Sequence, residues 1–183
     1  MPWGLRRFQE SGQTHFVTFG SYRRRESFKD AAAKRTYEAA LERVRCQFQM
    51  CVFGYVVMPD HIHLLVGEPQ RGVLADAIKS LKQGVSRRLI GNSEHFWQKR
   101  YYDFNVRSYA QHVEKLRYIH RNSVRRGVCE RPEDWEWSSF RQYATGCDGR
   151  VEIECEWTER RRERALGRLS AAVEKPHSSQ KKA

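Results

Sequence analysis

The strongest structural signal in the sequence is the run Val52-Phe53-Gly54-Tyr55-Val56-Val57-Met58-Pro59-Asp60-His61-Ile62-His63-Leu64-Leu65-Val66. Two runs rich in β-branched and aromatic residues flank the dipeptide Pro59-Asp60, which is typical of a tight turn. The stretch therefore predicts a β-hairpin with strands over residues 52–58 and 61–66.

Four further elements surround this hairpin. Residues 14–19 alternate polar and apolar side chains, as a half-buried strand does. Apolar residues recur at helical spacing over residues 30–48 and 73–89, and Asp30 is placed to cap the first of these helices. A fourth strand is expected within residues 96–106. The order strand–helix–strand–strand–helix–strand predicts an α+β fold of the ferredoxin-like, split βαβ type that RNA-recognition domains also use.

This fold implies a four-stranded antiparallel sheet with the first and third strands in its centre. Both helices would cover one face of the sheet, and the other face would be open. An additional helix is expected to begin after Ser108 and to stop at Gly127, with Gln111 in the capping-box position. The segment Trp135–Phe140, which holds two tryptophans, is expected to cover an edge of the core.

The chain has 183 residues and a formal net charge of +12. This length suits one domain of ordinary size, and apolar periodicity fades beyond about residue 158 while Arg and Lys come to outnumber acidic residues. We predict one domain over residues 1–157 and a basic, mobile tail over residues 158–183. The positive charge favours a polyanionic partner, and nucleic acid and anionic lipid both fit it.

The sequence contains no apolar run long enough to span a membrane, and its first residues lack the apolar core of a signal peptide. We therefore expect a cytoplasmic protein, associated with the nucleoid if it binds DNA, and no membrane partner. The five cysteines are scattered without a Cys-x-x-Cys motif, so we expect them to be reduced and not to form a zinc site.

His61 and His63 are two residues apart on a predicted strand, so both imidazoles project from the same face, whereas Ile62 and Leu64 point the other way. Imidazole is a common ligand of divalent metals, and the pair is a candidate metal site on the open face. The alternative interpretation is two polar residues on a solvated sheet face.

The helix after Ser108 contains a candidate nucleophile. Its apolar stripe is predicted to comprise Tyr109, Val113, Leu116, Ile119, His120 and Val124. Tyr118 falls nearly opposite the middle of that stripe, and Asn122 lies beside it one turn further on. The alternative is an ordinary exposed tyrosine on the polar face of a helix.

Residues 96–107 interleave aromatic rings with cations. Flat rings stack on unpaired bases and cations follow a phosphate backbone, so the segment is a candidate surface for single-stranded nucleic acid. The alternative is that some of these rings belong to the core. The candidate stacking rings and cations of this segment are Trp97, Lys99, Arg100 and Tyr102.

Three segments in this order carry a family resemblance: Met58–Val66, Phe96–Asp103 and Tyr118-Ile119-His120-Arg121-Asn122. Together they resemble the REP-associated tyrosine transposases, a branch of the single-tyrosine HUH transposases, over about residues 10–145. The resemblance implies cleavage and rejoining of single-stranded DNA through a 5′-phosphotyrosine intermediate. The DNA partner would be a REP hairpin with a flanking guide sequence.

The resemblance also implies roles for particular residues. His61, His63 and Asn122 would hold Mg²⁺ or Mn²⁺, and Tyr118 on the additional helix would be the nucleophile. The residues expected to contact DNA are Trp97, Lys99, Arg100, Tyr102, Arg121 and Arg125. Ser123 departs from the family pattern, which has proline after the asparagine, and this puts the end of the helix in question.

Two other interpretations remain open on the sequence. One is a catalytically inactive module that binds hairpin DNA or RNA, which the charge and the aromatic residues fit equally well. The other is a hydrolytic zinc nuclease, which is disfavoured because no acidic or cysteine ligand accompanies the histidine pair. A monomer and a homodimer are both compatible with the sequence, and so is a tyrosine that serves the histidines of a partner chain.

Overall fold

The structure is a computed structural model that describes residues 13–90 and 95–173, with side chains through residue 166. The strands are β1 (Thr14–Gly20), β2 (Val52–Val57), β3 (His61–Gly67) and β4 (Tyr102–Val106). The helices are α1 (Ala31–Phe48), α2 (Leu74–Ile90), α3 (Tyr109–Arg125), α4 (Phe140–Thr145) and α5 (Glu156–Val173). Short 3₁₀ turns η1 (Tyr22–Arg24) and η2 (Pro132–Asp134) follow β1 and α3.

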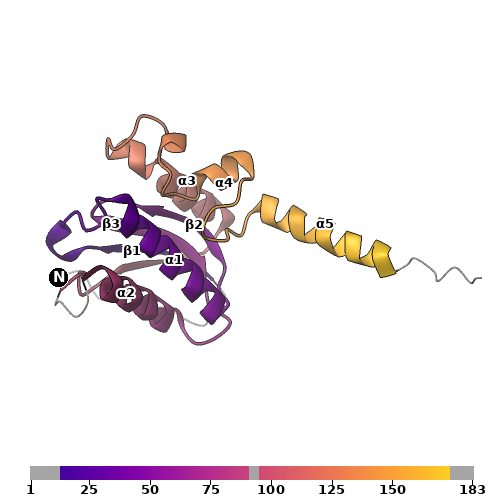
Figure 1. The fold of residues 1–183 in the computed structure, drawn as a ribbon, viewed down its shortest axis with the longest axis horizontal. Helices are drawn as coiled ribbons and strands as arrows, with labels where there is room; N and C mark the ends of the chain where they lie inside the picture. Colours follow the sequence, from indigo (N-terminus) through magenta and orange to yellow (C-terminus); the bar gives the residue numbers. More distant parts are fainter. Residues whose placement is uncertain (1–12, 91–94, 174–183) are drawn as a thin grey trace, which may run out of the picture.

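The four strands form one antiparallel sheet in the order β2-β3-β1-β4 (Figure 1). The predicted fold class and the central position of β1 and β3 are therefore confirmed. The hairpin predicted around Pro59-Asp60 is also confirmed, because the Met58 N–H donates to the His61 carbonyl at 2.9 Å. Strand β1 pairs with β3 of this hairpin on one side and with β4 on the other, which completes the sheet.

Helices α1 and α2 lie side by side on one face of the sheet, as expected. The side chains of Tyr37, Leu41, Ile78 and Leu81 are fully buried there, in one apolar cluster with inward residues of β1 and β3. Asp30 caps α1 as predicted, since its carboxylate accepts a hydrogen bond from the Ala33 N–H at 2.7 Å. This half of the molecule is the main core.

The opposite face of the sheet is not open, and in this respect the sequence-based expectation was wrong. Helix α3 packs across it, and Ile119 is fully buried in a second apolar cluster with Phe16, Val56 and Leu65. The helix comes so close to β2 that a Cβ atom at Gly54 would lie 2.6 Å from Leu116 Cδ1. Because glycine has no side chain, residue 54 allows α3 to pack this close to the sheet.

The outer edge of β2 is covered by the segment after α3, as the two tryptophans of Trp135–Phe140 predicted. The Val57 N–H donates to the Trp137 carbonyl at 2.9 Å, and the Ser139 N–H donates to the Tyr55 carbonyl at 3.0 Å. Further along, the Glu154 N–H donates to the Val52 carbonyl at 2.8 Å. The edge strand is therefore not exposed to pairing with another chain.

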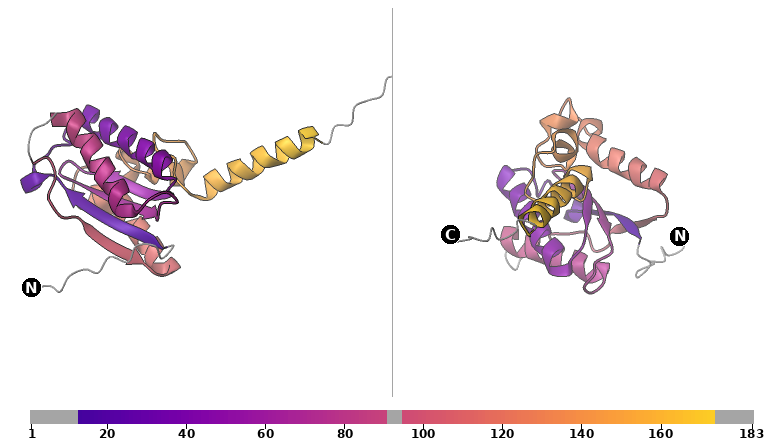
Figure 2. Two further views of the ribbon diagram at one scale, coloured as in Figure 1. Left: turned by 90° about the horizontal axis from the view of Figure 1, so that it is seen from below. Right: turned by 90° about the vertical axis from the view of Figure 1, so that its right-hand side faces the viewer.

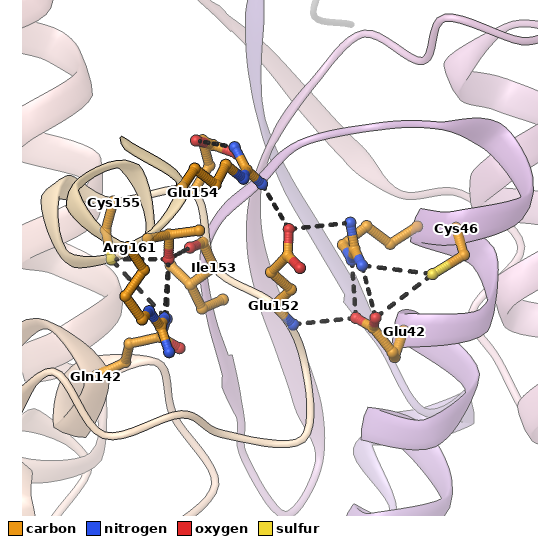
Figure 3. Close-up of polar contacts among 11 residues, drawn as sticks. Glu42, Cys46, Gln142, Glu152, Ile153, Glu154, Cys155 and Arg161 are labelled. Carbon is orange, nitrogen blue, oxygen red and sulfur yellow. Dashed lines mark hydrogen bonds and ion pairs between the residues drawn. The ribbon is translucent and has the colours of Figure 1, made fainter. Parts of the chain in front are cut away.

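The basic segment expected to begin at residue 158 starts inside helix α5, which projects away from the rest of the molecule (Figures 1 and 2). Glu152 joins this helix to the body: it pairs with Arg162 of α5 at 2.6 Å and with Arg45 of α1 at 3.5 Å, while its backbone N–H donates to Glu42 (Figure 3). A helix that projects in this way buries little apolar surface, which explains why the apolar periodicity of the sequence fades beyond about residue 158. Residues 174–183 of the expected tail lie outside the described residues.

Two other expectations concern the whole chain. All five cysteines are free. No helix among the described residues has the length and apolar character needed to cross a membrane.

A buried ionic network connects β4 to the middle of the sheet. The fully buried His15 ring lies with Nδ1 2.8 Å from Asp103 Oδ1 and Nε2 3.2 Å from Glu68 Oε1. Burial opposes a charge on this ring, but the hydrogen bonds and charges of Asp103 and Glu68 outweigh it, so the pKa of His15 is raised above its ordinary value. A protonated His15 donates to both carboxylates and holds β4 against β1.

We expect this network to give stability that depends on pH. Because the folded-state pKa of His15 is raised, its contribution is complete below the ordinary histidine pKa of about 6.5 and is lost as pH rises through the folded value. Urea unfolding of wild type and His15→Gln over a pH series checks this. The excess free energy of unfolding of the wild type should be largest at low pH; an excess that grows with pH would contradict the assignment. His61 and His63 have lowered pKa values and therefore give the opposite pH dependence. Because wild type and His15→Gln both contain them, their contribution cancels in the difference between the two proteins.

Candidate active site

The histidine pair lies on the face of the sheet that α3 covers. His61 is opposite Gly20 and His63 is opposite Thr18 in the pairing of β3 with β1. Both imidazoles are on the same face with their ring centroids 4.8 Å apart, and both residues are at least 95% buried. Phe16 stacks against the His63 ring at 5.5 Å. The pair is therefore held rigidly by the centre of the sheet.

Each histidine uses Nδ1 in a hydrogen bond within the protein. His61 Nδ1 donates to the Asp60 carboxylate at 2.5 Å, and His63 Nδ1 lies 2.8 Å from the Thr18 hydroxyl. These bonds leave Nε2 of each ring as the candidate ligand atom. Sequence reasoning missed both partners: Asp60 was interpreted only as a turn residue, and the position of Thr18 follows only from the strand register.

The site favours neutral imidazoles. Burial, together with the positive charges of His61, Arg126 and Arg24, lowers the pKa of His63 to about 3. Burial also lowers the pKa of His61, against the opposing influence of Asp60. Both rings are therefore unprotonated near neutral pH, which is the form that binds a metal.

Helix α3 brings Tyr118 and Asn122 to the histidines of the same chain. The Tyr118 ring meets His63 edge-on at 5.0 Å and Phe16 edge-on at 5.8 Å. It remains 36% exposed, and the Arg125 guanidinium lies 5.4 Å from its centroid. Asn122 is buried one turn further along the helix. Two segments that are far apart in the sequence thus meet where Tyr118 contacts His63. His61, His63, Tyr118 and the buried Asn122 on the same helix are the candidate cluster.

The packed face of α3 differs from the predicted apolar stripe. Tyr109 is 83% exposed, and Val113 and Val124 are only half-buried, whereas Ile119, Asn122 and Ser123 are buried. The helix is rotated because two polar residues face the sheet, which apolar periodicity alone does not reveal. This rotation places Tyr118 at the edge of the packed face. Helix α3 continues past Ser123 to Arg125 and stops at Gly127, as expected.

The donor atoms at this site fit a divalent metal. His63 Nε2 and Asn122 Oδ1 are both buried, and neither has a hydrogen-bond partner among residues 13–90 and 95–173. Unpaired buried polar atoms are costly, and a bound divalent ion would satisfy both of these. Among the described residues no group of three or more His, Cys, Asp or Glu side chains is placed to hold a metal. The third donor would therefore be the Asn122 amide oxygen.

The expected DNA-contacting residues fall into two groups. Tyr102 of β4 is 44% exposed and lies opposite Thr18 on the histidine face. Lys99, Arg100, Arg121 and Arg125 are also exposed, the last two on α3 beside Tyr118. All five are accessible to a ligand.

Trp97 forms the second of these groups. Its ring packs edge-on against Phe19 at 5.1 Å in the main core, and its indole N–H donates to the Lys82 carbonyl of α2 at 2.8 Å. This tryptophan is on the helix-covered side of the sheet, away from the histidines. It joins the segment before β4 to α2, and its contact with DNA stays a prediction.

A groove runs along the other side of Tyr118. It has a volume of about 760 Å³ and lies between the outward face of α3 and residues 130–133. Tyr118, Arg121 and Arg125 line it. The candidate nucleophile therefore lies between the histidine pair and this groove.

Comparisons with known proteins identify the family. The sequence model of the family described as "Transposase IS200 like" matches residues 9–122, a range that includes all four residues of the cluster. A putative REP-associated tyrosine transposase of Haemophilus influenzae is 32% identical over 97 residues, which are 46% of this chain and 55% of that relative. The REP-associated tyrosine transposase of Escherichia coli is 23% identical over 137 residues, which are 74% of this chain and 81% of that relative. The matched part of the chain thus spans about half the length of the first relative.

Among solved structures, one described as the REP-associated tyrosine transposase bound to a REP hairpin has the same fold. The TM-score is 0.69 at 20% sequence identity, and the match covers 84% of this chain and 92% of that one. The similarity confirms the sheet with its flanking helices.

Proposed function

This chain belongs to the family of IS200-like transposases, and from that premise we propose that it cuts and rejoins single-stranded DNA through a covalent bond to Tyr118. The observation that carries the proposal is the packing of the Tyr118 ring on His63, 5.0 Å away, in a cluster that holds two unpaired buried ligand atoms. A tyrosine present only to fill the core would not be 36% exposed at the edge of such a cluster.

In the proposed reaction the Tyr118 oxygen attacks the phosphorus of one DNA phosphodiester. A tyrosine–phosphorus bond forms, and the bond between phosphorus and the 3′ oxygen breaks. The tyrosine proton is lost to solvent, and the leaving oxygen takes up a proton to become a 3′-hydroxyl. The bond energy is kept in the 5′-phosphotyrosine, so attack by another 3′-hydroxyl reverses the step without ATP.

His61, His63 and Asn122 would hold Mg²⁺ or Mn²⁺ through the two Nε2 atoms and the amide oxygen. A bound ion of this kind supplies a Lewis acid that withdraws charge from the non-bridging oxygens of the phosphate. Asp60 and Thr18 fix the orientation of the two rings through Nδ1. The Tyr118 ring packs edge-on against the stacked rings of Phe16 and His63, which would keep it positioned beside the histidine pair.

The chain's own cations would favour entry of the phosphate. Arg24 of η1 pairs with Asp60 at 3.3 Å, and Arg126 follows the last turn of α3. The charges of both arginines act on the histidine pair. They approach it from different elements, so a phosphate at the cluster would meet positive charge from two directions.

The proposed DNA partner is a hairpin with unpaired flanks, in line with the REP hairpin named for the structural relative. Tyr102 supplies an exposed ring for base stacking on the histidine face, and Lys99 and Arg100 follow it closely in the chain. A DNA substrate would place the protein at the nucleoid. One chain contains the whole cluster, so a monomer and a homodimer would both be competent.

The direct test is the covalent intermediate. Single-stranded oligonucleotides with an imperfect hairpin and randomised flanks, labelled at either end, should yield a protein adduct on a denaturing gel when Mg²⁺ or Mn²⁺ is present and none with EDTA. The adduct should carry the 3′-labelled fragment, because the 5′ phosphate of the downstream fragment stays on tyrosine. Tight hairpin binding without cleavage or adduct would instead support the catalytically inactive binding module.

A further inference from the structure

The groove beside Tyr118 carries positive charge that the proposed chemistry at the histidines does not use. Arg117, Arg121 and Arg125 follow one another at intervals of one helical turn, about 6 Å, along the outward face of α3. All three are exposed. In the part of the chain that the structure describes, none of the three forms an ion pair with a carboxylate. They form a row of cations along one wall of the groove.

Three acidic residues also line the groove, Glu114, Glu130 and Glu133, and two of them are partly compensated by other cations. Glu114 pairs with Lys115 at 3.0 Å, and Glu133 lies 3.7 Å from Arg131, which also pairs with Asp134 at 3.0 Å. The arginine row is therefore available to an anionic ligand. Its last member, Arg125, lies over the Tyr118 ring, so the row leads directly to the candidate nucleophile.

The chemistry of the tyrosine step decides which part of the DNA this row meets. After attack, the phosphate that stays on Tyr118 is the 5′ phosphate of the downstream fragment, and the 3′ oxygen of the upstream fragment leaves on the side opposite the tyrosine. The fragment that remains attached thus starts at Tyr118 itself. Tyr118 has the buried histidine pair on one side and the groove on the other. A DNA strand that is attached to Tyr118 can therefore extend away from it along the groove.

We infer that this groove binds the DNA segment on the 3′ side of the cleavage site and retains it while it is bound to Tyr118. The inference rests on the proposed function and adds to it the identity of the strand that the arginine row recognises. Retention of this fragment favours rejoining over loss of the intermediate, because its 5′ end stays positioned at the site.

The test compares two DNA substrates in the absence of divalent metal, so that no cleavage occurs. Both carry the same selected hairpin and cleavage site; one ends a single nucleotide downstream of that site, and the other extends about eight nucleotides further. The groove variant is Arg117→Ala/Arg121→Ala. The control variant, Arg87→Ala/Arg88→Ala, removes the same charge from exposed positions at the end of α2. Fluorescence anisotropy at several salt concentrations gives affinity and salt dependence.

For wild type and the control variant, the long substrate should bind roughly tenfold or more tightly than the short one, since each added phosphate contact contributes to affinity. The groove variant should lose this difference, and its salt slope on the long substrate should fall by about two, one for each arginine. Binding to the short substrate should not change. Equal weakening on both substrates would overturn the inference, because the groove would then contact the hairpin instead.

The outcome for the groove is separable from the outcome for the reaction. If the covalent adduct forms but wild type and the groove variant respond equally to the downstream segment, the groove inference fails and the proposed function stands. If no adduct forms with any hairpin substrate, the proposed function fails irrespective of the binding data. Circular dichroism of both variants should match wild type, because all four arginines are exposed.

Discussion

Replacing Tyr118 with phenylalanine is expected to abolish strand cleavage and the covalent adduct, with a loss of rate of at least about 10⁴-fold. The substitution removes only the hydroxyl oxygen. The ring that packs against Phe16 and His63 remains, so folding and DNA affinity should stay close to wild type. The measurement is a denaturing gel of 5′- and 3′-labelled hairpin substrate, combined with a binding titration on the same DNA.

Tyr109→Phe is the matched control, because Tyr109 begins the same helix but is 83% exposed and has no contact with the histidine cluster. It should cleave like wild type. An adduct that persists in Tyr118→Phe would identify another tyrosine as the nucleophile. Tyr102 would then be the next candidate, since it is exposed on the same face of the sheet.

Replacing His63 with alanine is expected to lower the cleavage rate by at least about a hundredfold at any metal concentration, while DNA affinity is retained. The substitution removes one of the proposed ligand atoms. It also removes a buried ring that stacks on Phe16, so thermal unfolding must be measured beside activity. The decisive readout is the rate as a function of Mn²⁺ and Mg²⁺ concentration.

A milder variant keeps this test informative if His63→Ala folds poorly. Asp60→Asn leaves both imidazoles in place but replaces the carboxylate that accepts from His61 Nδ1. It should raise the metal concentration needed for half-maximal rate by about 10- to 100-fold and recover most of the rate at saturating Mn²⁺. His112→Ala, a change on α3 beside Phe53, should alter neither quantity. Unchanged metal dependence in both His63→Ala and Asp60→Asn would remove the case for a metal at this cluster.

The elements that carry a strong local signal were predicted well. The hairpin around Pro59-Asp60, the Asp30 cap of α1 and the order of strands and helices all follow from spacing within a few residues of sequence. Because side chains alternate on a strand, the common face of His61 and His63 also follows from the sequence alone. The predicted edge cover by the tryptophan segment depended on composition and was likewise confirmed.

What the sequence did not reveal depends on contacts between distant segments. The packing of α3 on the second face requires the close approach of Leu116 to Gly54. Nothing in the sequence near either residue predicts this contact. Apolar periodicity placed Tyr109 inside and Asn122 outside, because it cannot recognise a polar residue that is buried. Tryptophan suits both a core and a stacking surface, so the sequence alone could not show that Trp97 also packs against Phe19 and donates to Lys82.

The covered edge of β2 has a consequence for how much of this chain forms a viable unit. The family match ends at residue 122 and already includes every residue proposed to act in cleavage. A chain truncated there would nevertheless lose the partners of Val52, Tyr55 and Val57, which come from residues 137–154. It would expose an apolar strand edge of the kind that recruits further chains into aggregates. The smallest soluble catalytic fragment should therefore extend past residue 154, well beyond the smallest set of residues that the reaction uses.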